Sequence, residues 1–406
     1  MSKLEQLIKE LCPNGVEWKT VEEIFNLKNG YTPSKANKEY WENGTVPWFR
    51  MEDLRTNGNI LNDAVQHIHT SGVRGKLFPA NSIIMATTAT IGEHALITVD
   101  YMSNQQFTNF ALRDDICELI DTKFAYYYFF ILDEKAKQAV NTSSFPSVQM
   151  EQLKKWDFPL PPLPVQEEIV RILDNFTELT AELTAELTAE LTARKKQYEY
   201  YRNSLLSESE LCLDGVEYRK IKDCFQRLRG TAITAGKMKE IGCEAGEIRV
   251  FAGGKTVVNA NEKDIPNANI IRVPAVFVQS RGVIDVIYIE KPFTFKNEMW
   301  AYTHSEKTTV KYLFYFLKNN IQQFRSSASG MGSLPQISLP VTEDFLIPIP
   351  PLKEQERIVA ILDKFDTLTT SISEGLPAEI EARKQQYEYY RDNLLNFEKI
   401  DIEVLI

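Results

Sequence analysis

A long internal duplication constrains the fold of this chain of 406 residues more than any other feature. Residues 161–180 recur 189 positions later as residues 350–369, with 13 of 20 positions identical. Residues 193–206 recur at the same offset as residues 382–395, with 11 of 14 identical. Because both pairs share one offset, each copy lies on an equally long, uninterrupted element, and we expect two equivalent long segments.

A shorter repeat marks the start of two larger and dissimilar segments. Residues 11–30 are similar to residues 211–230 at an offset of 200. The residues that follow them, 31–157 and 231–345, show no alignment with each other. The repeats therefore predict two variable domains that alternate with two repeated segments; the domains are residues 1–158 and 207–348, and the segments are residues 159–206 and 349–406.

The repeated segments have the pattern of long helices. A Pro-Pro pair precedes each one, which suits a helix start but not a helix interior. Apolar residues of the first copy follow at helical spacing, namely Ile169, Ile172, Leu173, Phe176, Leu179 and Leu183. No Pro or Gly interrupts residues 165–206, which predicts a rod of roughly 60 Å. Gly375 and Pro377 predict a break in the second copy, with the helix resuming near Ala378.

The first repeated segment contains the tetrapeptide Thr-Ala-Glu-Leu three times, at 180–183, 184–187 and 188–191. Four residues advance a helix by about 400°, so the Leu stripe drifts by about 40° per repeat. Two interpretations remain open. The repeats form a low-complexity surface helix, or they act as a spacer in which each added repeat lengthens the rod by about 6 Å.

Neither predicted rod can bury its apolar stripe alone, and the other rod is the obvious complement. Antiparallel packing is the economical arrangement, and it predicts an internal pseudo-two-fold axis with one variable domain at each end. Such a geometry suits the reading of two separated half-sites on duplex DNA.

The charge pattern leaves DNA binding open. The net charge is -10, but residues 207–348 carry 18 basic and 16 acidic side chains. Net charge bears on solubility and steering and does not exclude a DNA site, although it suggests that any strong hold on phosphates is shared with a partner. No apolar run is long enough to cross a bilayer, and charged residues lie within residues 1–6, so we expect a cytoplasmic protein without membrane contact.

Cysteine and histidine patterns predict neither disulfides nor a metal site. The five cysteines are widely spaced and form no C-x-x-C pair. His67 and His69 lack a third ligand nearby, and a surface strand is the simpler interpretation.

Each variable domain alternates strand-like runs with turns and ends in an aromatic-rich helix, which predicts an α+β fold. The strand-like runs are 82–85, 95–99, 270–273 and 283–289, the helices are 124–130 and 310–317, and the loops after them are 142–145 and 326–332.

The order of motifs in the first domain resembles a target recognition domain of type I restriction–modification systems. These motifs are residues 30–34, 46–50 through 53–54, 89–92 and 104–107, followed by the closing segment with Gln166-Glu167-Glu168-Ile169-Val170. With the duplication, the resemblance covers nearly the whole chain and identifies it as similar to a specificity subunit, close to the subgroup with Thr-Ala-Glu-Leu repeats. The second domain has residues 251–254 and 279–282, but lacks the Ala-Thr-Ile-Gly and Asn-Gln motifs.

The resemblance implies a subunit without catalysis, in which each domain reads one half of a bipartite double-stranded DNA target. The helices would set the spacer and dock two methyltransferase subunits, which methylate adenine. Restriction and translocase subunits would join this core. S-adenosylmethionine, ATP and Mg²⁺ are expected in those partners, and no cofactor or metal is expected in this chain.

The sequence offers no catalytic motif of its own. A phosphate loop needs G-x-x-x-x-G-K-[ST], but its first Gly is replaced by Arg249, so Gly254-Lys255-Thr256 is interpreted as a hairpin turn. The Pro-Pro pairs are flanked by Leu or Ile and do not match an adenine methyltransferase motif. A coiled-coil scaffold that binds only proteins remains the alternative, although it leaves the two divergent domains without a purpose.

The candidate DNA-contacting residues are those that can donate to base edges or phosphates. They are Tyr31, Thr32, Ser34, Arg50, Thr90, Gln105 and Ser144 in the first domain, and Arg227, Arg229, Lys255, Gln279, Arg281, Ser329 and Gln336 in the second. The alternative for each is an ordinary surface residue. Four tyrosines that are identical between the repeats are predicted to dock partner subunits, namely Tyr198, Tyr201, Tyr387 and Tyr390.

Overall fold

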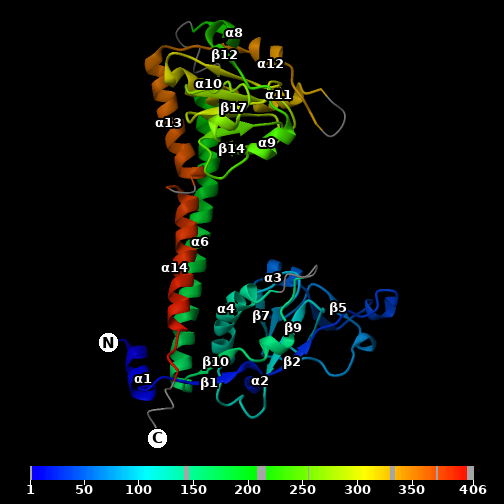
Figure 1. Ribbon diagram of the computed structural model, residues 1–406. Coiled ribbons are helices and arrows are strands. Elements are labelled where there is room, and N and C mark those ends of the chain that lie inside the picture. Colours follow the sequence, from blue (N-terminus) through cyan, green and yellow to red (C-terminus); the bar gives the residue numbers. More distant parts are fainter. Residues whose placement is uncertain are drawn as a thin grey trace. The chain divides into compact units, whose positions relative to one another are not determined.

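The computed structural model describes residues 2–140, 146–207, 216–254, 256–329, 334–371 and 374–399. The chain forms two compact units. Unit 1 comprises Met1–Thr184 and Ala382–Ile406, and unit 2 comprises Ala185–Glu381. Each unit therefore joins one variable domain to parts of both repeated segments, and the continuous helix α6 (Leu163–Leu205) contributes to both units (Figure 1).

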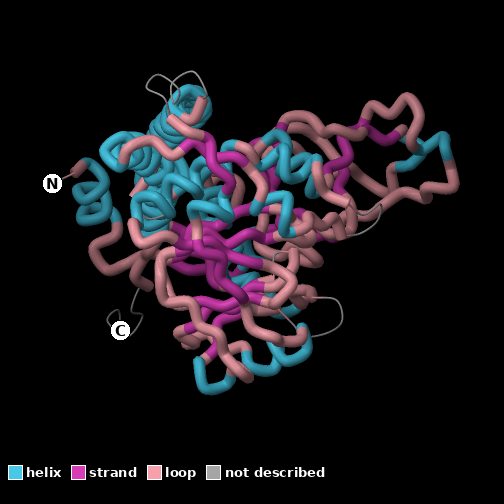
Figure 2. The backbone as a smooth tube through the Cα atoms, turned by 90° about the horizontal axis from the view of Figure 1, so that it is seen from above, coloured by secondary structure: helices cyan, strands magenta, loops and turns pink. Residues whose placement is uncertain are grey.

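Unit 1 is built on a five-stranded sheet in the order β2-β9-β6-β7-β4. The strands are β2 (Phe25–Asn29), β9 (Phe107–Leu112), β6 (Ser82–Ala86), β7 (His94–Ile97) and β4 (Ile60–Leu61). A second sheet has the order β5-β3-β8, with β5 (His67–Ile68), β3 (Val46–Phe49) and β8 (Met102–Ser103). The segment around β5 extends away from α4, and short helical turns lie at its tip (Figures 1 and 2). A two-stranded sheet pairs β1 (Glu17–Thr20) with β10 (Asp157–Leu160).

Unit 2 repeats this plan. Its main sheet has the order β12-β18-β15-β16, with β12 (Gln226–Arg229), β18 (Trp300–Thr303), β15 (Ala275–Gln279) and β16 (Asp285–Ile289). Its second sheet is β14-β13-β17, with β14 (Val257–Ala260), β13 (Ile248–Phe251) and β17 (Phe293–Phe295). The pair β11 (Tyr218–Lys220) and β19 (Leu346–Pro348) completes it.

Matching main-chain hydrogen bonds show that the two variable domains share one backbone frame. In unit 1, β3 runs parallel to β8, and the amide of Asn104 donates to the carbonyl of Phe49 (3.0 Å). In unit 2, β13 runs parallel to β17, and the amide of Lys296 donates to the carbonyl of Phe251 (3.1 Å). The domains therefore have equivalent folds, although their sequences show no alignment over these residues.

One long helix covers the main sheet of each domain. In unit 1 this helix is α4 (Thr122–Gln138), which packs on β6 and β7, and in unit 2 it is α10 (Lys307–Asn319), which packs on β15 and β16. Both helices carry the predicted aromatic residues, and most of these are buried; examples are Phe124 and Phe129 in α4 and Tyr312 and Tyr315 in α10. Burial of such large side chains is the main apolar contribution to each core.

Shorter helices connect the strands. They are α1 (Lys3–Leu11), α2 (Val21–Ile24), α3 (Met51–Asn57) and α5 (Met150–Leu153) in unit 1, and α8 (Ile221–Cys224), α9 (Ala235–Ile241), α11 (Ile321–Ser326) and α12 (Leu339–Glu343) in unit 2. Three turns are 3-10 helical, namely η1 (Lys38–Tyr40), η2 (Thr70–Gly72) and η3 (Glu262–Asp264).

The repeated segments are helical, as predicted. The first is the single helix α6, which starts directly after the Pro-Pro pair and runs for 43 residues. The second is divided into α13 (Leu352–Thr370) and α14 (Leu376–Leu394). The predicted break is confirmed, and the helix resumes at Leu376, two residues before the predicted Ala378. Pro377 therefore lies in the first turn of α14, where its missing amide proton is tolerated.

Within unit 1, α6 and α14 pack antiparallel. The ring of Phe176 in α6 stacks on Tyr390 in α14, with centroids 6.0 Å apart and an angle of 1° between the rings. Three residues earlier in α6, Leu173 is buried in the same core cluster as Leu395, which follows α14. Because one residue number falls as the other rises, the two segments run in opposite directions.

Unit 2 contains the equivalent pair of helices. Phe365 of α13 stacks on Tyr201 of α6, with centroids 5.5 Å apart and an angle of 28°. Leu362 and Leu206 are buried in one core cluster. Each of these four residues is related by the offset of 189 to a residue of the unit 1 pair, so the repeat is used twice for the same antiparallel contact.

Two strand predictions in the second domain need correction. Residues 270–273 are not a strand, because only Ile271 makes an isolated bridge there. The run 283–289 forms a strand only from Asp285, after a turn at Gly282 with a positive φ of 81°. β13 and β14 pair antiparallel on either side of the hairpin expected at residues 254–256, of which Lys255 lies outside the described residues. Among the described residues, no helix combines the length and apolar character needed to cross a membrane.

We predict that Gly30→Ala and Gly230→Ala each destabilise the unit that carries the change. A Cβ atom at Gly30 would lie 2.2 Å from the carbonyl oxygen of Asn104, and at Gly230 it would lie 2.0 Å from that of Phe295. Because both neighbours are main-chain atoms of a central turn or strand, the expected loss is about 1–3 kcal/mol. Calorimetry of the full chain measures it as a lower unfolding temperature.

Gly236→Ala in α9 is the matched control, because its Cβ would meet nothing within 4 Å and Ala favours a helix. An unfolding temperature of the Gly30 or Gly230 variant equal to that of this control would contradict the prediction.

Candidate nucleic-acid interface

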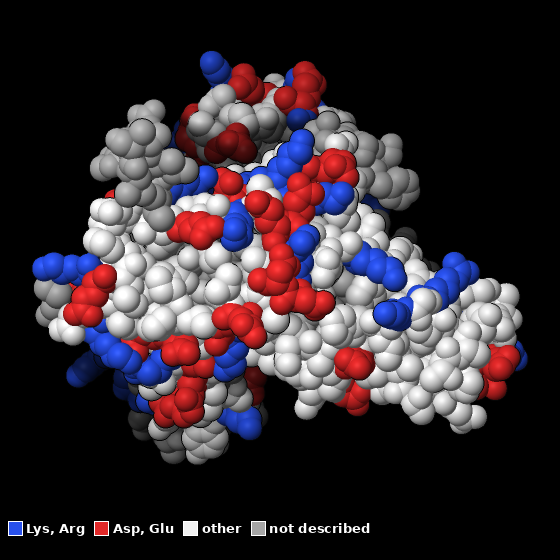
Figure 3. All heavy atoms as spheres, turned by 90° about the horizontal axis from the view of Figure 1, so that it is seen from below, with Lys and Arg blue, Asp and Glu red and all other residues white. Residues whose placement is uncertain are grey.

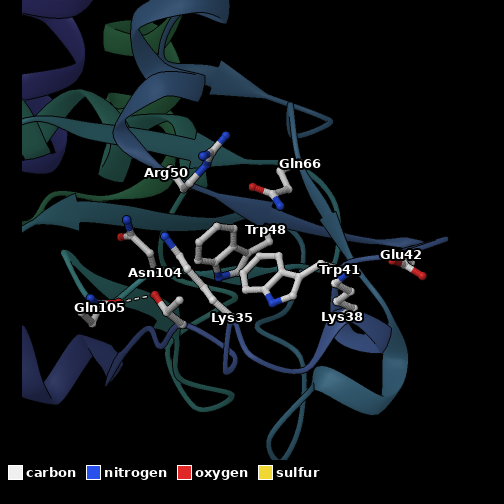
Figure 4. A pocket seen from close by; sticks show the side chains of 10 residues that line it. Lys35, Lys38, Trp41, Glu42, Trp48, Arg50, Gln66, Asn104 and Gln105 are labelled. Atoms are coloured by element: carbon white, nitrogen blue, oxygen red, sulfur yellow. Dashed lines mark hydrogen bonds between the residues drawn. The ribbon is translucent and has the colours of Figure 1, made fainter.

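A pocket of about 640 Å³ lies in the first variable domain, beside the ends of β2 and β3 (Figure 4). Two tryptophans lie at its centre, and basic and amide side chains surround them (Figure 4). The lining residues are Thr32, Lys35, Lys38, Trp41, Glu42, Trp48, Arg50, Gln66, Asn104 and Gln105. Flat apolar surface next to amide and guanidinium donors is a combination that can contact nucleotides.

Local hydrogen bonds fix the two tryptophan rings. The indole nitrogen of Trp41 donates to the carbonyl of Ser34, and that of Trp48 donates to the carbonyl of Tyr31, both at 3.1 Å. The rings meet edge to face, with centroids 4.9 Å apart and an angle of 79°. Tyr31 and Ser34 therefore support the pocket through their main chain. The hydroxyl of Tyr31 is bonded within the domain, and burial raises its pKa.

Arg50 is held over the pocket by an aromatic and an acidic neighbour. Its guanidinium carbon lies 5.6 Å from the centre of the Trp48 ring, and its Nη2 lies 2.7 Å from a carboxylate oxygen of Glu52. Its Nε atom is buried and has no hydrogen-bond partner in the structure. Because this atom is buried, any donor capacity toward the pocket comes from the other N–H groups of the guanidinium.

The turn at residues 104–107 presents an exposed amide at the pocket. A main-chain hydrogen bond of 3.2 Å between its end residues closes the turn, and Asn104 braces it by bonding both the amide and the side chain of Gln106 at 3.0 Å. Gln105, at the tip, is exposed and accepts a hydrogen bond from the hydroxyl of Thr32. Backbone closure therefore leaves the Gln105 side chain directed outward.

The second domain carries a pocket of about 700 Å³, and the two linings share only the tip of one equivalent turn, at Gln105 and Asn297. It is lined by residues 227–230, 297–300 and 336–339, together with Asn269. Arg227 is paired with Glu343 at 2.9 Å, and Arg229 is exposed. The turn 296–299 is closed by a main-chain hydrogen bond of 3.0 Å, as in the first domain. Asn297, the second residue of this turn, is exposed and occupies the place of Gln105.

The structure gathers three of the predicted first-domain residues at the pocket, namely Thr32, Arg50 and Gln105. Thr90 is not among the lining residues and lies in the turn between β6 and β7, next to Ala89 with its positive φ of 63°. Ser144 lies outside the described residues.

In the second domain, Arg227, Arg229 and Gln336 line the pocket. Arg281 and Ser329 both form β-bridges with Gln336, so these three residues lie together. Gln279 differs, because its side chain is buried (7% exposed) and its Nε2 atom has no partner in the structure. A residue so buried cannot reach DNA without a rearrangement. Lys255 lies outside the described residues.

Sequence reasoning missed several pocket residues. Asn297 escaped notice because the second domain has no Asn-Gln motif, and only the matched hydrogen bonds reveal its equivalence to Gln105. Lys35, Trp41 and Gln66 lie in stretches without a motif. The spacing of Trp41 and Trp48 was the one available signal for the first pocket, because two large aromatic rings close to predicted polar contacts are candidates for stacking.

The predicted docking tyrosines have mixed positions. Tyr198 and Tyr387 are half-buried against neighbouring helices, and burial raises the pKa of both hydroxyls. Tyr201 and Tyr390 stack on phenylalanines as described above, yet keep 39% and 45% of their surface exposed. The neighbouring Tyr200 and Tyr389 are the more exposed rings, at 69% and 66%. The repeated tyrosine cluster thus has one side in the helix pair and one side toward solvent.

Charges are mixed on the surface. On the face shown in Figure 3, the described Lys and Arg side chains alternate with Asp and Glu instead of gathering in one basic patch. His67 pairs with Asp63 (2.7 Å) and His69 with Ser71 (2.8 Å), so both histidines have partners within their own surface segment.

The combination of a duplicated α+β domain, a polar pocket in each copy and repeated helices defines a class of proteins. The family model for the "Type I restriction modification DNA specificity domain" matches residues 13–193 and 214–382, which is one copy for each domain with its following helix. The chain belongs to this family of specificity subunits, which are non-catalytic parts of type I restriction–modification systems and carry two target recognition domains.

Characterised relatives extend over nearly the full chain. The EcoprrI type I restriction enzyme specificity subunit of Escherichia coli is 39% identical over 389 residues, covering 92% of this chain and 93% of that protein. The EcoR124I/EcoR124II specificity subunit of the same species is 31% identical over 428 residues, covering 98% of each.

Solved structures support the fold. A chain described under "Structural basis underlying complex assembly and conformational transition of the type I R-M system" has a TM-score of 0.67 at 15% identity, with 95% of this chain and 98% of that chain covered. The HsdS subunit from Thermoanaerobacter tengcongensis has a TM-score of 0.54 at 15% identity, with 95% and 97% covered.

We predict that Gln105→Ala and Asn297→Ala each weaken binding to only one part of the DNA target. Each exposed amide can donate and accept in a bidentate contact with a base, so its loss is expected to cost about 1–3 kcal/mol. Binding of the assembled complex to duplexes with one or the other part of the target randomised measures the effect.

Asn26→Ala and Gln226→Ala are matched controls, because these exposed amides lie on β2 and β12 and are not among the residues that line the pockets. If Gln105→Ala and Asn297→Ala lowered affinity for the same part of the target, the assignment of one pocket to each part would be wrong.

Proposed function

We propose that each domain of this specificity subunit reads one half of a bipartite double-stranded DNA target through its pocket. The observation that carries the proposal is a shared backbone frame that presents different side chains at the same position. The turn 104–107 offers Gln105, and the equivalent turn 296–299 offers Asn297. A common frame gives both domains the same approach to DNA, and the different side chains give them different base preferences.

The contrast extends to neighbouring positions, which favours two unlike half-sites. Arg50 follows the frame residue Phe49, whereas Ala252 follows the equivalent Phe251. Arginine reads guanine through two donors, whereas Ala252 is buried (8% exposed) and does not line the second pocket, so this position offers no equivalent base contact. The tryptophan pair of the first pocket likewise has no counterpart among the lining residues of the second. A target of two different half-sites, separated by bases of any identity, is therefore expected.

The Thr-Ala-Glu-Leu repeats are proposed to set the length of that separation, which would place this chain in the subgroup with such repeats. They lie within the uninterrupted helix α6, so insertion or removal of a repeat changes the length of a continuous element. The leucines of the repeats, Leu183, Leu187 and Leu191, are only half-buried, so this stretch has no fully buried leucine core that would resist a change in length.

Partner subunits complete the proposed activity. Two methyltransferase subunits would dock on the repeated tyrosine clusters, where Tyr200 and Tyr389 offer the largest exposed aromatic surface. Restriction and translocase subunits would then join, and S-adenosylmethionine, ATP and Mg²⁺ would act in these partners. On the face shown in Figure 3 the described Lys and Arg side chains form no large basic patch, which supports this division of labour, because partner subunits can then supply further phosphate contacts.

The direct test is to reconstitute the complex with its methyltransferase subunits and map the methylated adenines on genomic DNA. Two short, unlike motifs at a fixed separation support the proposal. Methylation without sequence preference, or a continuous palindromic site, rejects it. A protein-only coiled-coil scaffold, the competing function, predicts that removal of this chain leaves the sequence specificity of its partners unchanged.

We predict that deleting one repeat, residues 184–187, shortens the preferred spacer by one or two base pairs. The deletion removes about 6 Å of helix, and one base-pair step spans about 3.4 Å. Methylation rates on duplexes that differ only in spacer length measure the preference. Glu186→Gln keeps the helix length and serves as the control. An unchanged optimal spacer length in the deletion variant would reject the proposed role of the repeats.

We also predict that Arg281→Ala weakens recognition of the second half-site only, by about 1–3 kcal/mol if the contact is bidentate. Arg281 is exposed beside Gln336, whereas the buried Gln279 is expected to affect stability and not base preference when replaced by Ala. Affinities on duplexes with substituted bases separate the two. An equal loss on every sequence would instead identify Arg281 as a phosphate contact.

A further inference from the structure

The same three side chains join the variable domain to the repeated helix in both units. In unit 1 the hydroxyl of Tyr127 donates to Oδ1 of Asp174 at 2.8 Å, and Nζ of Lys123 donates to Oδ2 of the same carboxylate at 2.7 Å. We call Lys123, Tyr127 and Asp174 the first clamp. Lys123 and Tyr127 lie one turn apart on α4, so both reach one carboxylate of α6.

Unit 2 contains an equivalent set of residues. Tyr315 donates to Oδ1 of Asp363 at 2.5 Å, and Nζ of Lys311 donates to Oδ2 at 2.7 Å. Lys311, Tyr315 and Asp363 form the second clamp, which joins α10 to α13. In both clamps the tyrosine and the lysine bond different oxygens of one carboxylate, in domains whose sequences do not align between the repeats.

The surroundings of each clamp favour a fixed geometry. Tyr127 and Tyr315 are only 3% and 1% exposed, so both rings are locked by packing. Burial and the adjacent carboxylate raise the pKa of each tyrosine hydroxyl, which therefore stays a donor at neutral pH. The carboxylates are about one third exposed, so the clamp lies at the edge of the core and is not the source of its apolar stability. Two directional bonds to one planar group restrain rotation of the domain on its helix more than apolar contacts do.

We infer that the clamps are positioning devices that fix the orientation of each recognition domain on its helix and thereby determine how strictly the complex selects spacer length. This inference rests on the proposed function, since spacer selection presupposes two half-sites. An apolar interface alone tolerates small rotations, and a domain that rotates can reach half-sites at a wrong separation. Loosening a clamp should therefore broaden spacer selection while base preference, set in the distant pocket turn, stays the same.

The test uses the full complex with its methyltransferase subunits and duplexes whose half-sites are separated by the native spacer or by one base pair more or fewer. Tyr127→Phe and Tyr315→Phe each remove one hydroxyl without changing ring packing. The expected result is that the ratio of methylation rates on native and altered spacers falls by about tenfold, the worth of a hydrogen bond to a charged group. Preference for the bases of each half-site stays unchanged.

Tyr128→Phe is the matched control, because it removes a hydroxyl from the neighbouring buried ring of α4, outside the clamp. Lys123→Met gives a second route if the tyrosine variants do not assemble, since Lys123 is about half exposed and its loss leaves the core intact. Asp174→Glu, which keeps both acceptors, should restore part of the selectivity lost in Asp174→Ala.

The outcomes distinguish failure of the positioning role from failure of the proposed function. An equal loss of rate on all spacers, or an unchanged ratio in both tyrosine variants, overturns the positioning role and leaves the proposed function intact. If the wild-type complex itself shows no spacer preference, the proposed function fails first. A lower unfolding temperature with an unchanged spacer ratio would mark the clamps as purely structural.

Discussion

The structure depends on one constraint: no repeated helix segment can bury its apolar face without another. Each unit satisfies this constraint in the same way, with the stacked pair Phe176 and Tyr390 in unit 1 and the pair Phe365 and Tyr201 in unit 2. The same residue types form the contact between the two helices in both units, so a substitution in one contact makes it differ from the other. The repeated stretches keep 13 of 20 and 11 of 14 positions, whereas the variable domains show no alignment, so this shared contact lies within the stretches that stay similar.

The two domains illustrate how stability and specificity can be separated within one fold. Main-chain hydrogen bonds at the turns 104–107 and 296–299 hold the pocket frame, and they make no demand on the side chain at the tip. Gln105 and Asn297 can therefore differ without any change of the frame. Residues that close the frame sterically, such as Gly30 and Gly230, occupy the same place in both domains, because any Cβ atom would collide with the main chain. A side chain can therefore vary only at positions where main-chain hydrogen bonds alone hold the structure.

Features that depend on local sequence could be predicted, whereas features that depend on packing between distant segments could not. The long helices, their antiparallel partners within each unit and the break before α14 were predictable, because periodicity and Pro or Gly act locally. The strand at 270–273 was predicted wrongly, since short apolar runs do not reveal their pairing partners. The equivalence of Asn297 to Gln105 was not predictable either, because it is encoded in main-chain bonds between distant segments. Burial of Gln279 depends on the packing of the whole sheet and could not be read from its motif.

The balance of charges at the pockets bears on how a protein of net charge -10 can act on DNA. Arg50 lies next to Glu52, and Arg227 next to Glu343, so two central guanidinium groups already have acidic neighbours. Such partly exposed pairs are worth at most about 1 kcal/mol, and a base edge that offers better geometry can displace the carboxylate. Contacts between the same arginines and DNA phosphates contribute less binding free energy, because the nearby carboxylates repel the phosphates. The acidic neighbours thus reduce non-specific affinity more than base-specific affinity, and this bias suits a subunit whose role within a larger complex is to select a sequence.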